Sequence, residues 1–320
     1  MSSQTFRWAL LKLTRPQAPR PPSHSTLRSE VTLLDKVRNR SARARQHRWR
    51  TRSYHSSERH IVIGGSPRSG TTLFRRILDR HPSICCGPEM NVYLPARFQF
   101  DPLAALSEVP AADLRAMFRS SPSQGAFIDA FAARYRSLRG KPRWAEKTPL
   151  NVRHFGWVLE RFPDVRLVHV IRDGRDAVCS AAKHPDRRWV DGAWVWQLHP
   201  HSLEDLARTW VTDTSAGMRF RGDPRYREVR YEDLVTRPDE TLRELCDFLG
   251  EPFDADVLDG EQGDAPPTPV PTAGAAVASP DRGQVFTHSI GRWRRDIPAA
   301  ELPKVLAICR ARLAELGYGD

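Results

Sequence analysis

The stretch Ile61–Thr72 reads IVIGGSPRSGTT and decides how the protein folds. It begins with three β-branched residues, which two glycines follow, and a helical pattern continues over 72–80. This order predicts a strand, a loop and a helix. A second such unit starts at Val165–Ile171, VRLVHVI, and continues through a polar turn into a helical pattern over 176–183. Alternating strands and helices predict an α/β fold with a central parallel sheet flanked by helices.

The loop in this stretch is a candidate phosphate-binding site. Residues 65–72, GSPRSGTT, fit the pattern GxxxxGK[ST] except that Thr71 stands where the lysine belongs. That lysine reaches the terminal phosphates of a triphosphate, so a shorter and differently terminated phosphate ester is the expected ligand. Backbone amides, the helix start near Gly70 and the charge of Arg68 would form the anion cradle. Taken alone, the letters fit an ordinary Gly/Ser-rich turn equally well.

A second anion site is predicted where the next strand ends, at Arg172–Asp176, RDGRD. Arg172 at the strand end and Ser180 in the following helix can face one phosphate, because the carboxyl edge of a parallel sheet and the next helix start share a crevice. The alternative is an Asp/Arg network that only caps the helix and leaves Ser180 exposed. Two anion sites on adjacent strand ends favour a functional interpretation over chance.

The remaining elements extend the same domain toward the C-terminus. A short strand is predicted at Arg227–Tyr231, and a helix follows over Pro238–Leu249, closed by Gly250. Residues 251–286 are rich in Pro, Gly, Ala and Asp and are interpreted as a mobile loop. The α/β domain is therefore expected to span 59–320. Helical periodicity also occurs over 104–138, 203–220 and 299–316.

The net charge of +12 is concentrated in an N-terminal arm. Residues 1–60 hold 14 Lys and Arg against three acids, whereas 61–320 are close to neutral. Prolines, serines and an arginine run over 38–52 predict that 1–58 form a mostly disordered arm. The arm either binds an acidic surface such as RNA, phospholipid or a protein, or is a solvated extension. Aromatic residues do not alternate with the arginines as base stacking requires, so no specific nucleic-acid partner is predicted.

Hydropathy and cysteine usage indicate the environment of the protein. No apolar run approaches the roughly 20 residues that span a bilayer, and the mean hydropathy is −0.54, so no membrane span is expected. The apolar patch Trp8–Leu13 is too short for a secretory signal. Five cysteines form no CxxC pair and no zinc-type spacing, which predicts buried, reduced thiols and no metal site. A cytoplasmic protein is the expectation.

Six motifs occur in order between residues 60 and 300, namely IVIGGSPRSGTTLFRRILDRHP, CGPE, EKTP, VIRDGRDAVCS, VRYEDL and SIGRWRRDI. Together they resemble the sulfotransferases that use 3′-phosphoadenosine 5′-phosphosulfate (PAPS), and most closely the protein-tyrosine sulfotransferases and their bacterial relatives. The resemblance implies a P-loop type fold and an enzyme that transfers the sulfuryl group of PAPS to a hydroxyl acceptor and releases adenosine 3′,5′-bisphosphate (PAP). Such a donor carries a 5′-phosphosulfate and a separate 3′-phosphate, which accounts for two anion sites, no metal and the lost lysine.

The resemblance also implies roles for single residues. Lys147 of EKTP would stabilise charge on the transferring group, with Arg68 beside it, and Glu89 of CGPE would be the general base. The 5′-phosphosulfate would be bound by Ser66, Pro67, Arg68, Ser69, Gly70, Thr71 and Thr72. The 3′-phosphate would be bound by Arg172 and Ser180, and a closing segment would cover it with Ser289, Gly291 and Arg292. Tyr231 would lie near the adenine.

Two departures from the animal tyrosine-sulfating enzymes concern the acceptor side and the compartment. Ala145 stands where those enzymes have the disulfide partner of Cys86, which supports a reducing compartment. Met90 and Asn91 replace their Thr and Arg. The acceptor therefore stays open between a small molecule, a carbohydrate, a lipid and a peptide, and a homodimer also stays open.

Two other classes of protein remain as alternatives. A P-loop kinase is disfavoured because the lysine is absent and no convincing magnesium-binding acid follows a second strand. A nucleotide- or RNA-binding module would make the basic arm the working part, so deletion of 1–58 would abolish its function. If Glu89 is not the proton acceptor of the enzyme, the next candidates are His81 and His154.

Overall fold

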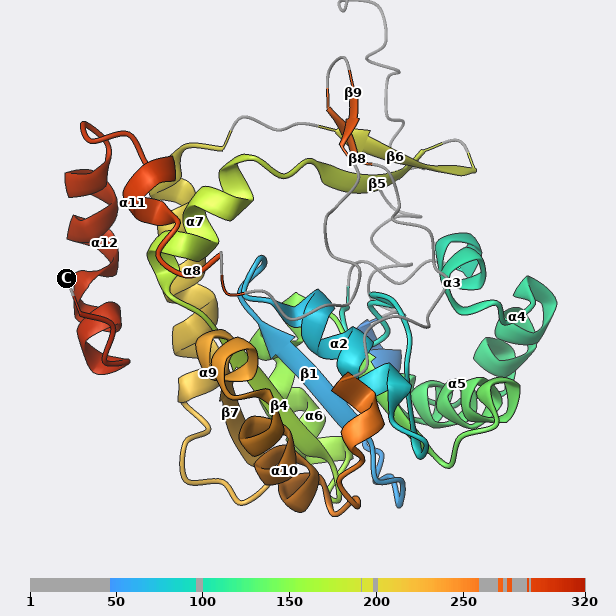
Figure 1. Cartoon of the computed structure of the whole chain (residues 1–320). Helices are drawn as coiled ribbons and strands as arrows, with labels where there is room; N and C mark the ends of the chain where they lie inside the picture. The colour runs from blue at the N-terminus through green and yellow to red at the C-terminus, as the bar shows by residue number, and fades with distance from the viewer. Residues whose placement is uncertain are drawn as a thin grey trace, which may run out of the picture. The chain divides into compact units, whose positions relative to one another are not determined.

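The computed structural model describes residues 47–95, 100–190, 192–197, 201–258, 270–272, 275–277, 287 and 289–319. A five-stranded parallel sheet with the order β2-β3-β1-β4-β7 lies at the centre of this body (Figure 1). Its strands are β1 (Ile61–Gly65), β2 (Ile84–Cys86), β3 (Arg143–Lys147), β4 (Arg166–Ile171) and β7 (Tyr226–Arg230). The predicted P-loop type α/β fold is confirmed. Because all five strands are parallel, their carboxyl ends meet at one edge.

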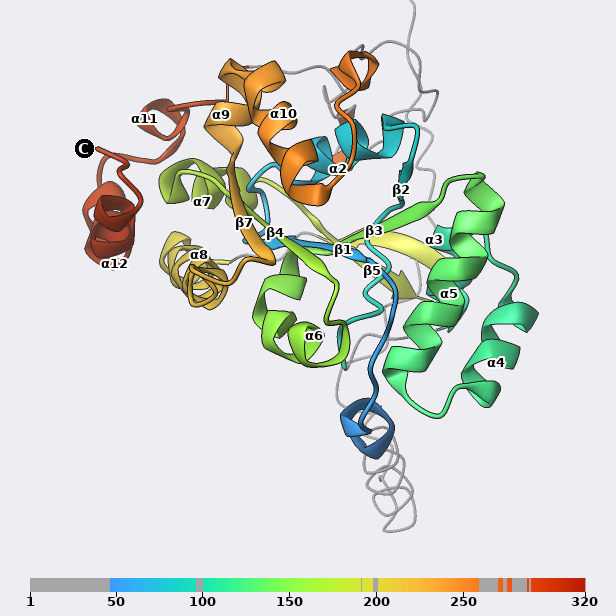
Figure 2. The same cartoon turned by 90° about the horizontal axis from the view of Figure 1, so that it is seen from below.

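Helices cover both faces of the sheet, as Figure 2 shows. One face carries α2 (Thr71–Arg80), α9 (Tyr231–Thr236) and α10 (Pro238–Leu249), which pack through Phe74, Leu234, Leu242 and Leu245. The opposite face carries α5 (Gln124–Arg139) and α6 (Phe155–Arg161), with a core of Phe127, Phe131, Trp144, Phe155 and Phe162. Burial on both faces explains why β1 is apolar along its length.

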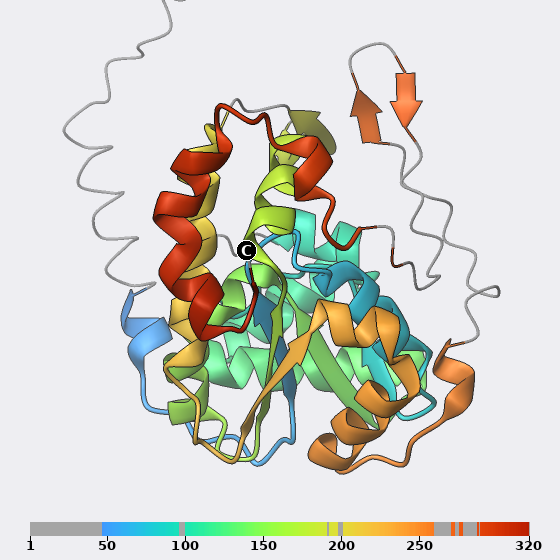
Figure 3. The same ribbon diagram turned by 60° about the vertical axis from the view of Figure 1, so that its left-hand side comes forward.

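A third apolar cluster includes Ile171 at the end of β4, next to the edge strand β7. The cluster joins α7 (Gly174–Ala182), α8 (Leu203–Met218), α11 (Trp293–Asp296) and α12 (Leu302–Glu315) through Val178, Trp210, Trp293 and Val305. Figure 3 shows the C-terminal helices of this cluster, drawn in red, at the front. The last two helices, α11 and α12, are thus packed against the helix that follows β4. This packing brings residues near 290 and 318 to the start of α7.

The remaining described elements are short. Two 3₁₀ helices occur, η1 (Pro149–His154) directly after β3 and η2 (Ala255–Leu258). Two antiparallel pairs are β5 (Asp186–Val190) with β6 (Ala193–Gln197), and β8 (Val270–Thr272) with β9 (Ala275–Val277). The helices α3 (Phe100–Ser107) and α4 (Ala111–Ser120) precede α5.

The predicted elements are largely confirmed, with small shifts in bounds. The helix predicted over 238–249 has those bounds, and Gly250 ends it with a left-handed φ of 71°. The strand predicted to end at Tyr231 ends at Arg230, and Tyr231 begins α9 instead. The helical range 104–138 contains the second half of α3, all of α4 and all of α5 except Arg139. Neither β2 nor β3 was predicted.

The expected boundary of the arm at residue 58 is wrong. The folded unit starts at His47, and residues 1–46 lie outside the described residues. Arg50 is 8% exposed, and it donates to Tyr93 O at 2.8 Å and stacks on the Trp157 ring at 4.2 Å. Asp129 of α5 accepts hydrogen bonds from Tyr54 and Ser56. A cationic stretch therefore joins the core because its arginine and tyrosine side chains find buried partners.

The predicted mobile loop over 251–286 is also partly wrong. Residues 251–258 are packed, because Val257 is 4% exposed and η2 lies against α2. His81 and Arg80 bond to the carbonyls of Pro252 and Val257. The segment also includes the β8–β9 pair, and its other residues lie outside the described part.

Candidate active site

The loop after β1 is shaped by glycines. Ser69 N donates to Ser66 O at 3.2 Å, and Gly70 has a φ of 88° that L-residues rarely adopt. A Cβ at Gly70 would also collide with the ring of Tyr231. The first turn of α2 has no acidic residue, and its amides are not capped by any described side-chain group. These amides are therefore available to an anion.

Arg68 connects this loop to the neighbouring strand end. Its backbone has a φ of 68°, which costs a non-glycine residue about 1–2 kcal/mol. Its Nε donates to Ser180 Oγ at 3.3 Å, and its carbonyl accepts from Arg172 Nη1 at 3.2 Å. The two predicted anion sites are thus in direct contact.

Arg172 is the central cation of the second site and lies directly after β4. It is 5% exposed, its Nη2 donates to Ser289 O at 2.6 Å, and its guanidinium lies 4.4 Å from the centre of the Tyr231 ring. Its Nε is buried and has no hydrogen-bond partner in the described structure. The structure therefore brings Arg68, Arg172, Ser180, Tyr231 and Ser289 together.

The cap predicted in the alternative interpretation of RDGRD exists, but the exposed Ser180 of that alternative is wrong, because Ser180 is 8% exposed. Asp173 caps α7, because its Oδ1 accepts from Arg175 N at 2.8 Å. Gly174 is packed so tightly on Trp210 that a Cβ would overlap the indole. Trp210 Nε1 in turn donates to Arg172 O at 3.1 Å. The cap therefore fixes the backbone that carries Arg172.

The closing segment is held by a buried carboxylate that the sequence did not single out. Asp176 is fully buried, and it accepts from Gly291 N at 2.8 Å and from Trp293 N at 3.0 Å. Burial raises the pKa of Asp176, while these amides and Arg172 oppose the shift. Arg292 instead pairs with Asp296 at 2.8 Å, away from the contacts of Arg172.

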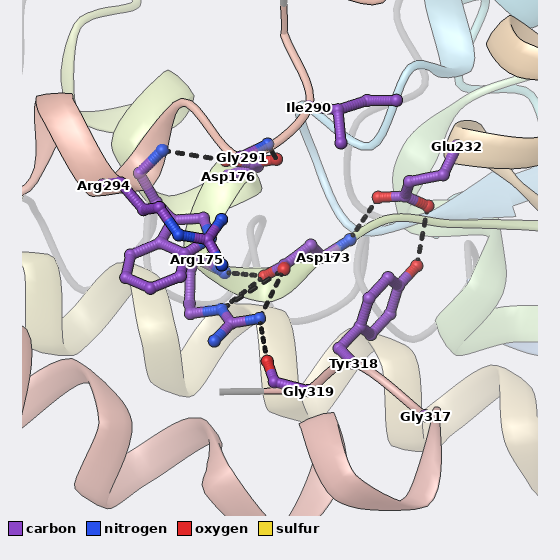
Figure 4. A pocket seen from close by; sticks show the side chains of 11 residues that line it. Asp173, Arg175, Asp176, Glu232, Ile290, Gly291, Arg294, Gly317, Tyr318 and Gly319 are labelled. Atoms are coloured by element: carbon purple, nitrogen blue, oxygen red, sulfur yellow. Dashed lines mark hydrogen bonds and ion pairs between the residues drawn. The ribbon is translucent and has the colours of Figure 1, made fainter.

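A recess of about 260 Å³ lies behind the start of α7, between the closing segment and the C-terminal residues (Figure 4). Glu232 accepts from Asp173 N at 2.9 Å and from the Tyr318 hydroxyl at 2.8 Å. Arg175 Nη2 donates to Gly319 O at 2.6 Å. The last described residues are therefore bonded to the loop that carries Arg172.

Glu89 and Lys147 form an ion pair next to the phosphate loop. Lys147, the last residue of β3, is 3% exposed, whereas 48% of the Glu89 side chain is exposed, and Nζ lies 2.6 Å from Oε1. Burial would raise the pKa of Glu89. Lys147, together with Arg68 and His184, outweighs that effect and lowers this pKa overall. Glu89 is therefore ionised at neutral pH.

The other two candidate bases have separate roles. His81 accepts from Ser83 N at 3.1 Å through Nδ1, and its Nε2 bonds to Pro252 O, so it closes the turn before β2. His154 has its pKa lowered to about 4 by burial and by Arg50 and Arg153. Neither histidine bonds to Glu89 or Lys147 in the described residues.

Other supporting residues were also missed by the sequence analysis. Glu146 is buried at the end of β3 and bonds to Thr148 and Asn151. Asp213 of α8 pairs with Arg153; burial raises the pKa of Asp213, while Arg153 and Ser66 oppose this. The available signal was position: Asp213 lies one turn after Trp210 on the apolar face of its helix.

Cys86 and Ala145 are register partners on the neighbouring strands β2 and β3. Cys86 therefore faces an alanine on the neighbouring strand and has no second thiol there. All five cysteines are free and buried, as expected. In the described ranges, no group of three or more His, Cys, Asp or Glu side chains could hold a metal ion. No helix in those ranges is both long and apolar enough to span a bilayer.

Strand, phosphate loop and helix, with a second cationic strand end beside them, define a P-loop α/β protein. Residues 60–255, more than half of the chain, match the sulfotransferase family. The chain therefore belongs to the sulfotransferase family.

Three individual proteins illustrate the likeness. The chain is 28% identical to the protein-tyrosine sulfotransferase of Drosophila melanogaster over 84% of this chain and 53% of that protein. It is 26% identical to protein-tyrosine sulfotransferase 1 of Danio rerio over 81% of this chain and 72% of that protein. The sulfotransferase domain of the Synechococcus PCC 7002 olefin synthase has a TM-score of 0.52 and 21% identity, covering 82% of this chain and 96% of that chain. The chain spans about half the length of the Drosophila relative.

Proposed function

We propose that the protein transfers the sulfuryl group of PAPS to a hydroxyl acceptor and releases PAP. The observation that carries the proposal is the contact between two anion sites, made by Arg68 with Ser180 and by Arg172 with Arg68. A donor with phosphates at both the 5′ and the 3′ positions matches two cationic sites at adjacent strand ends. Membership of the sulfotransferase family supports the same activity.

Unused hydrogen-bonding groups at the site fit such a donor. Ser69 Oγ and Arg172 Nε are buried and lack partners within the described residues, a state that costs free energy unless a ligand or water completes it. The amides at the start of α2 have no competing carboxylate in their first turn. We assign the 5′-phosphosulfate to Ser66–Thr72 and the 3′-phosphate to Arg172 and Ser180, with Ser289 of the closing segment beside them. Gly291 supports this site indirectly, because its amide is bonded to Asp176.

Arg292 contributes to this site indirectly. Its guanidinium is engaged by Asp296, which also contacts Lys183 and Arg295. We therefore give Arg292 the role of anchoring the closing segment to the end of α7. Tyr231 contacts both Gly70 and Arg172, which supports a place for its ring at the junction of the two phosphate sites.

The transfer step uses the Glu89–Lys147 pair. PAPS supplies an activated sulfuryl group whose bond to the 5′-phosphate oxygen breaks as the acceptor oxygen bonds to sulfur. Glu89 takes the proton of the acceptor hydroxyl, and the electron pair of the broken bond stays on the phosphate of PAP. Lys147 and Arg68 stabilise the negative charge on that oxygen and on the sulfuryl oxygens.

The ion pair sets the strength of the base. Before transfer, Lys147 holds the pKa of Glu89 below its ordinary value, so the carboxylate is ionised but weakly basic. When Lys147 turns toward the negative charge of bound PAPS, it stabilises the Glu89 carboxylate less. The pKa of Glu89 then rises. A base with a pKa closer to the working pH transfers protons more effectively.

The acceptor is proposed only by class, as a hydroxyl compound. Small molecules, carbohydrates, lipids and peptides all qualify, and the names of the relatives make tyrosyl peptides the first to test. The decisive experiment is transfer of sulfur-35 from labelled PAPS in an extract, followed by identification of the labelled product. Label that stays in PAPS and free sulfate, with no product dependent on the protein, would contradict the proposal.

We also propose that the protein acts in a reducing compartment, with the cytoplasm as the expected one. Support comes from five free buried cysteines and from Ala145 opposite Cys86. Cell fractionation tests this, and recovery in an oxidising compartment would contradict it.

A further inference from the structure

Two polar residues on either side of Lys147 are buried where a strand ends. Glu146 and Thr148 are each 1% exposed. Because side chains alternate along a strand, both lie on the side opposite to Lys147. Thr148 Oγ1 donates to Glu146 Oε1 at 2.6 Å. Burying a carboxylate and a hydroxyl costs free energy unless hydrogen bonds satisfy them. The other hydrogen bonds of these two groups therefore indicate what they do.

Their remaining bonds go to the loop that carries Glu89. Met90 N donates to Glu146 Oε1 at 3.2 Å, and Asn91 N donates to Thr148 Oγ1 at 3.2 Å. Asn91, two residues after Glu89, has a φ of 58° and so lies in the left-handed region of backbone conformation. Two consecutive backbone amides are thereby fixed to the strand end that carries Lys147.

The same carboxylate is anchored to the centre of the sheet. Asn151 of η1 is fully buried, and its Nδ2 donates both to Glu146 Oε2 and to Ile63 O, the latter at 3.1 Å. Ile63 belongs to β1, which leads into the phosphate loop. A series of bonds therefore runs from the phosphate-loop strand through Asn151 and Glu146 to the Glu89 loop.

We propose that Glu146 and Thr148 are positioning residues that hold the Glu89 loop against Lys147, and that together they set the 2.6 Å contact of the base with the lysine. The proposal rests on the proposed function, since it concerns the same Glu89–Lys147 pair. Neither residue contacts the acceptor in this role; they act through the backbone of Met90 and Asn91.

A change at Thr148 has a defined electrostatic consequence. Thr148→Val keeps the shape but leaves Asn91 N without its acceptor, so the loop moves away from Lys147. Glu89 faces three cationic groups, Lys147 of β3, Arg68 of the phosphate loop and His184 after α7. Lys147 contributes most of the lowering, so a looser pair raises the pKa of Glu89. A general base works when ionised, so the acid limb of the kcat/KM profile shifts to higher pH.

The test compares three variants of the full-length protein. Thr148→Val removes the hydroxyl, Thr148→Ser restores it, and Ser107→Ala is the matched control. Ser107 is also fully buried and makes two bonds, to Leu103 O at 2.7 Å and from Val109 N at 3.3 Å, on α3. We expect kcat of Thr148→Val to fall about 10- to 100-fold, as for a slightly misplaced catalytic group. Its acid limb moves to higher pH, and PAP affinity stays within about twofold.

The outcomes separate positioning from stability. We expect Thr148→Ser to restore the wild-type pH profile and Ser107→Ala to lower the melting temperature without changing that profile. An acid limb of Thr148→Val identical to wild type would overturn the proposal, whatever its melting temperature.

A second readout does not depend on activity. The carboxyl carbon of Glu89, followed by NMR in labelled protein and assigned with Glu89→Gln, is expected to titrate at higher pH in Thr148→Val than in wild type. If no acceptor is ever sulfated, the proposed function fails while this titration still tests the positioning. If transfer occurs but the titration is unchanged, only the positioning proposal fails.

Discussion

The donor side and the transfer side of the site are built differently. On the donor side, Arg172, Ser180 and Tyr231 are each less than one-tenth exposed and contact segments from four parts of the sequence. On the transfer side, Lys147 is buried, but almost half of the Glu89 side chain is exposed. The comparison teaches that the groups for the donor are preorganised, whereas the base is left open toward the acceptor.

The largest effect is expected on the transfer side. Glu89→Gln keeps the size of the side chain but cannot take a proton, so kcat should fall about 100- to 10,000-fold. PAP affinity, measured by calorimetry, should barely change because Glu89 is not among the donor-binding residues.

The matched control is Glu251→Gln at the other end of β3. Glu251 pairs with Arg143 at 2.7 Å, so it tests loss of a strand-end ion pair outside the site. A Glu89→Gln variant that retained near wild-type turnover would remove Glu89 from the role of base. Parallel losses of turnover and donor affinity would mean that the two sides are not separable.

A comparison of two nucleotides tests which ligand the donor side binds. PAP should raise the melting temperature strongly, because a ligand at about 100 times its Kd stabilises the native state by about 2.7 kcal/mol. ATP with magnesium at the same concentration should raise it far less, since Thr71 replaces the lysine that reaches terminal phosphates. Equal shifts in thermal denaturation would favour the kinase alternative.

Arg172→Ala tests the centre of the donor side. The loss of a charge-assisted phosphate bond should weaken PAP binding by about 1.5–3 kcal/mol. Arg166→Ala is the control, because Arg166 lies at the opposite end of the same strand and bonds to Phe248 O. An unchanged Kd for Arg172→Ala in calorimetry would exclude Arg172 from the site.

The smallest effect is expected behind the donor side. Tyr318→Phe removes one hydrogen bond to Glu232, so PAP affinity should fall by about 0.5–1.5 kcal/mol through the Asp173 loop. Tyr226→Phe is the control, since Tyr226 also loses a buried hydroxyl, which bonds to His169 and Glu228. A similar loss of PAP affinity in both variants would show general loosening, not a link to the donor loop.

The donor side was predictable because its backbone geometry requires particular residue types in the sequence. Gly65 and Gly70 are required where a side chain would collide with Val170 or Tyr231, and the apolar strands β1 and β4 precede the two loops. By contrast, β3 reads RWAEK, and its three charged residues conceal a strand that is buried along its length. Arg143, Glu146 and Lys147 find their partners only when the fold brings Glu251, Thr148 and Glu89 to the ends of β3.

The supporting residues could not be predicted for a similar reason. No local sequence pattern distinguishes Asp176, Glu232 and Tyr318 from other polar residues. Their roles depend on contacts between segments that are distant in sequence. The Tyr318–Glu232 and Gly291–Asp176 bonds exist because α12 and α11 pack on α7 and α8, and no local pattern specifies that packing. Hydrophobic periodicity predicts where helices form, but it does not predict which helices pack against one another.

The four-segment construction of the donor site has a consequence for synthesis of the protein. Arg68 and Ser180 are 112 residues apart, Arg172 and Ser289 are 117 apart, and Glu232 and Tyr318 are 86 apart. Such long loops close slowly and late. A nascent polypeptide that has made the whole parallel sheet still lacks the closing segment and its anchors, so it should bind PAP poorly until residues 289–319 have emerged. During that interval the apolar faces of α7 and α8 lack their contacts with α12, which makes the growing polypeptide a target for chaperones.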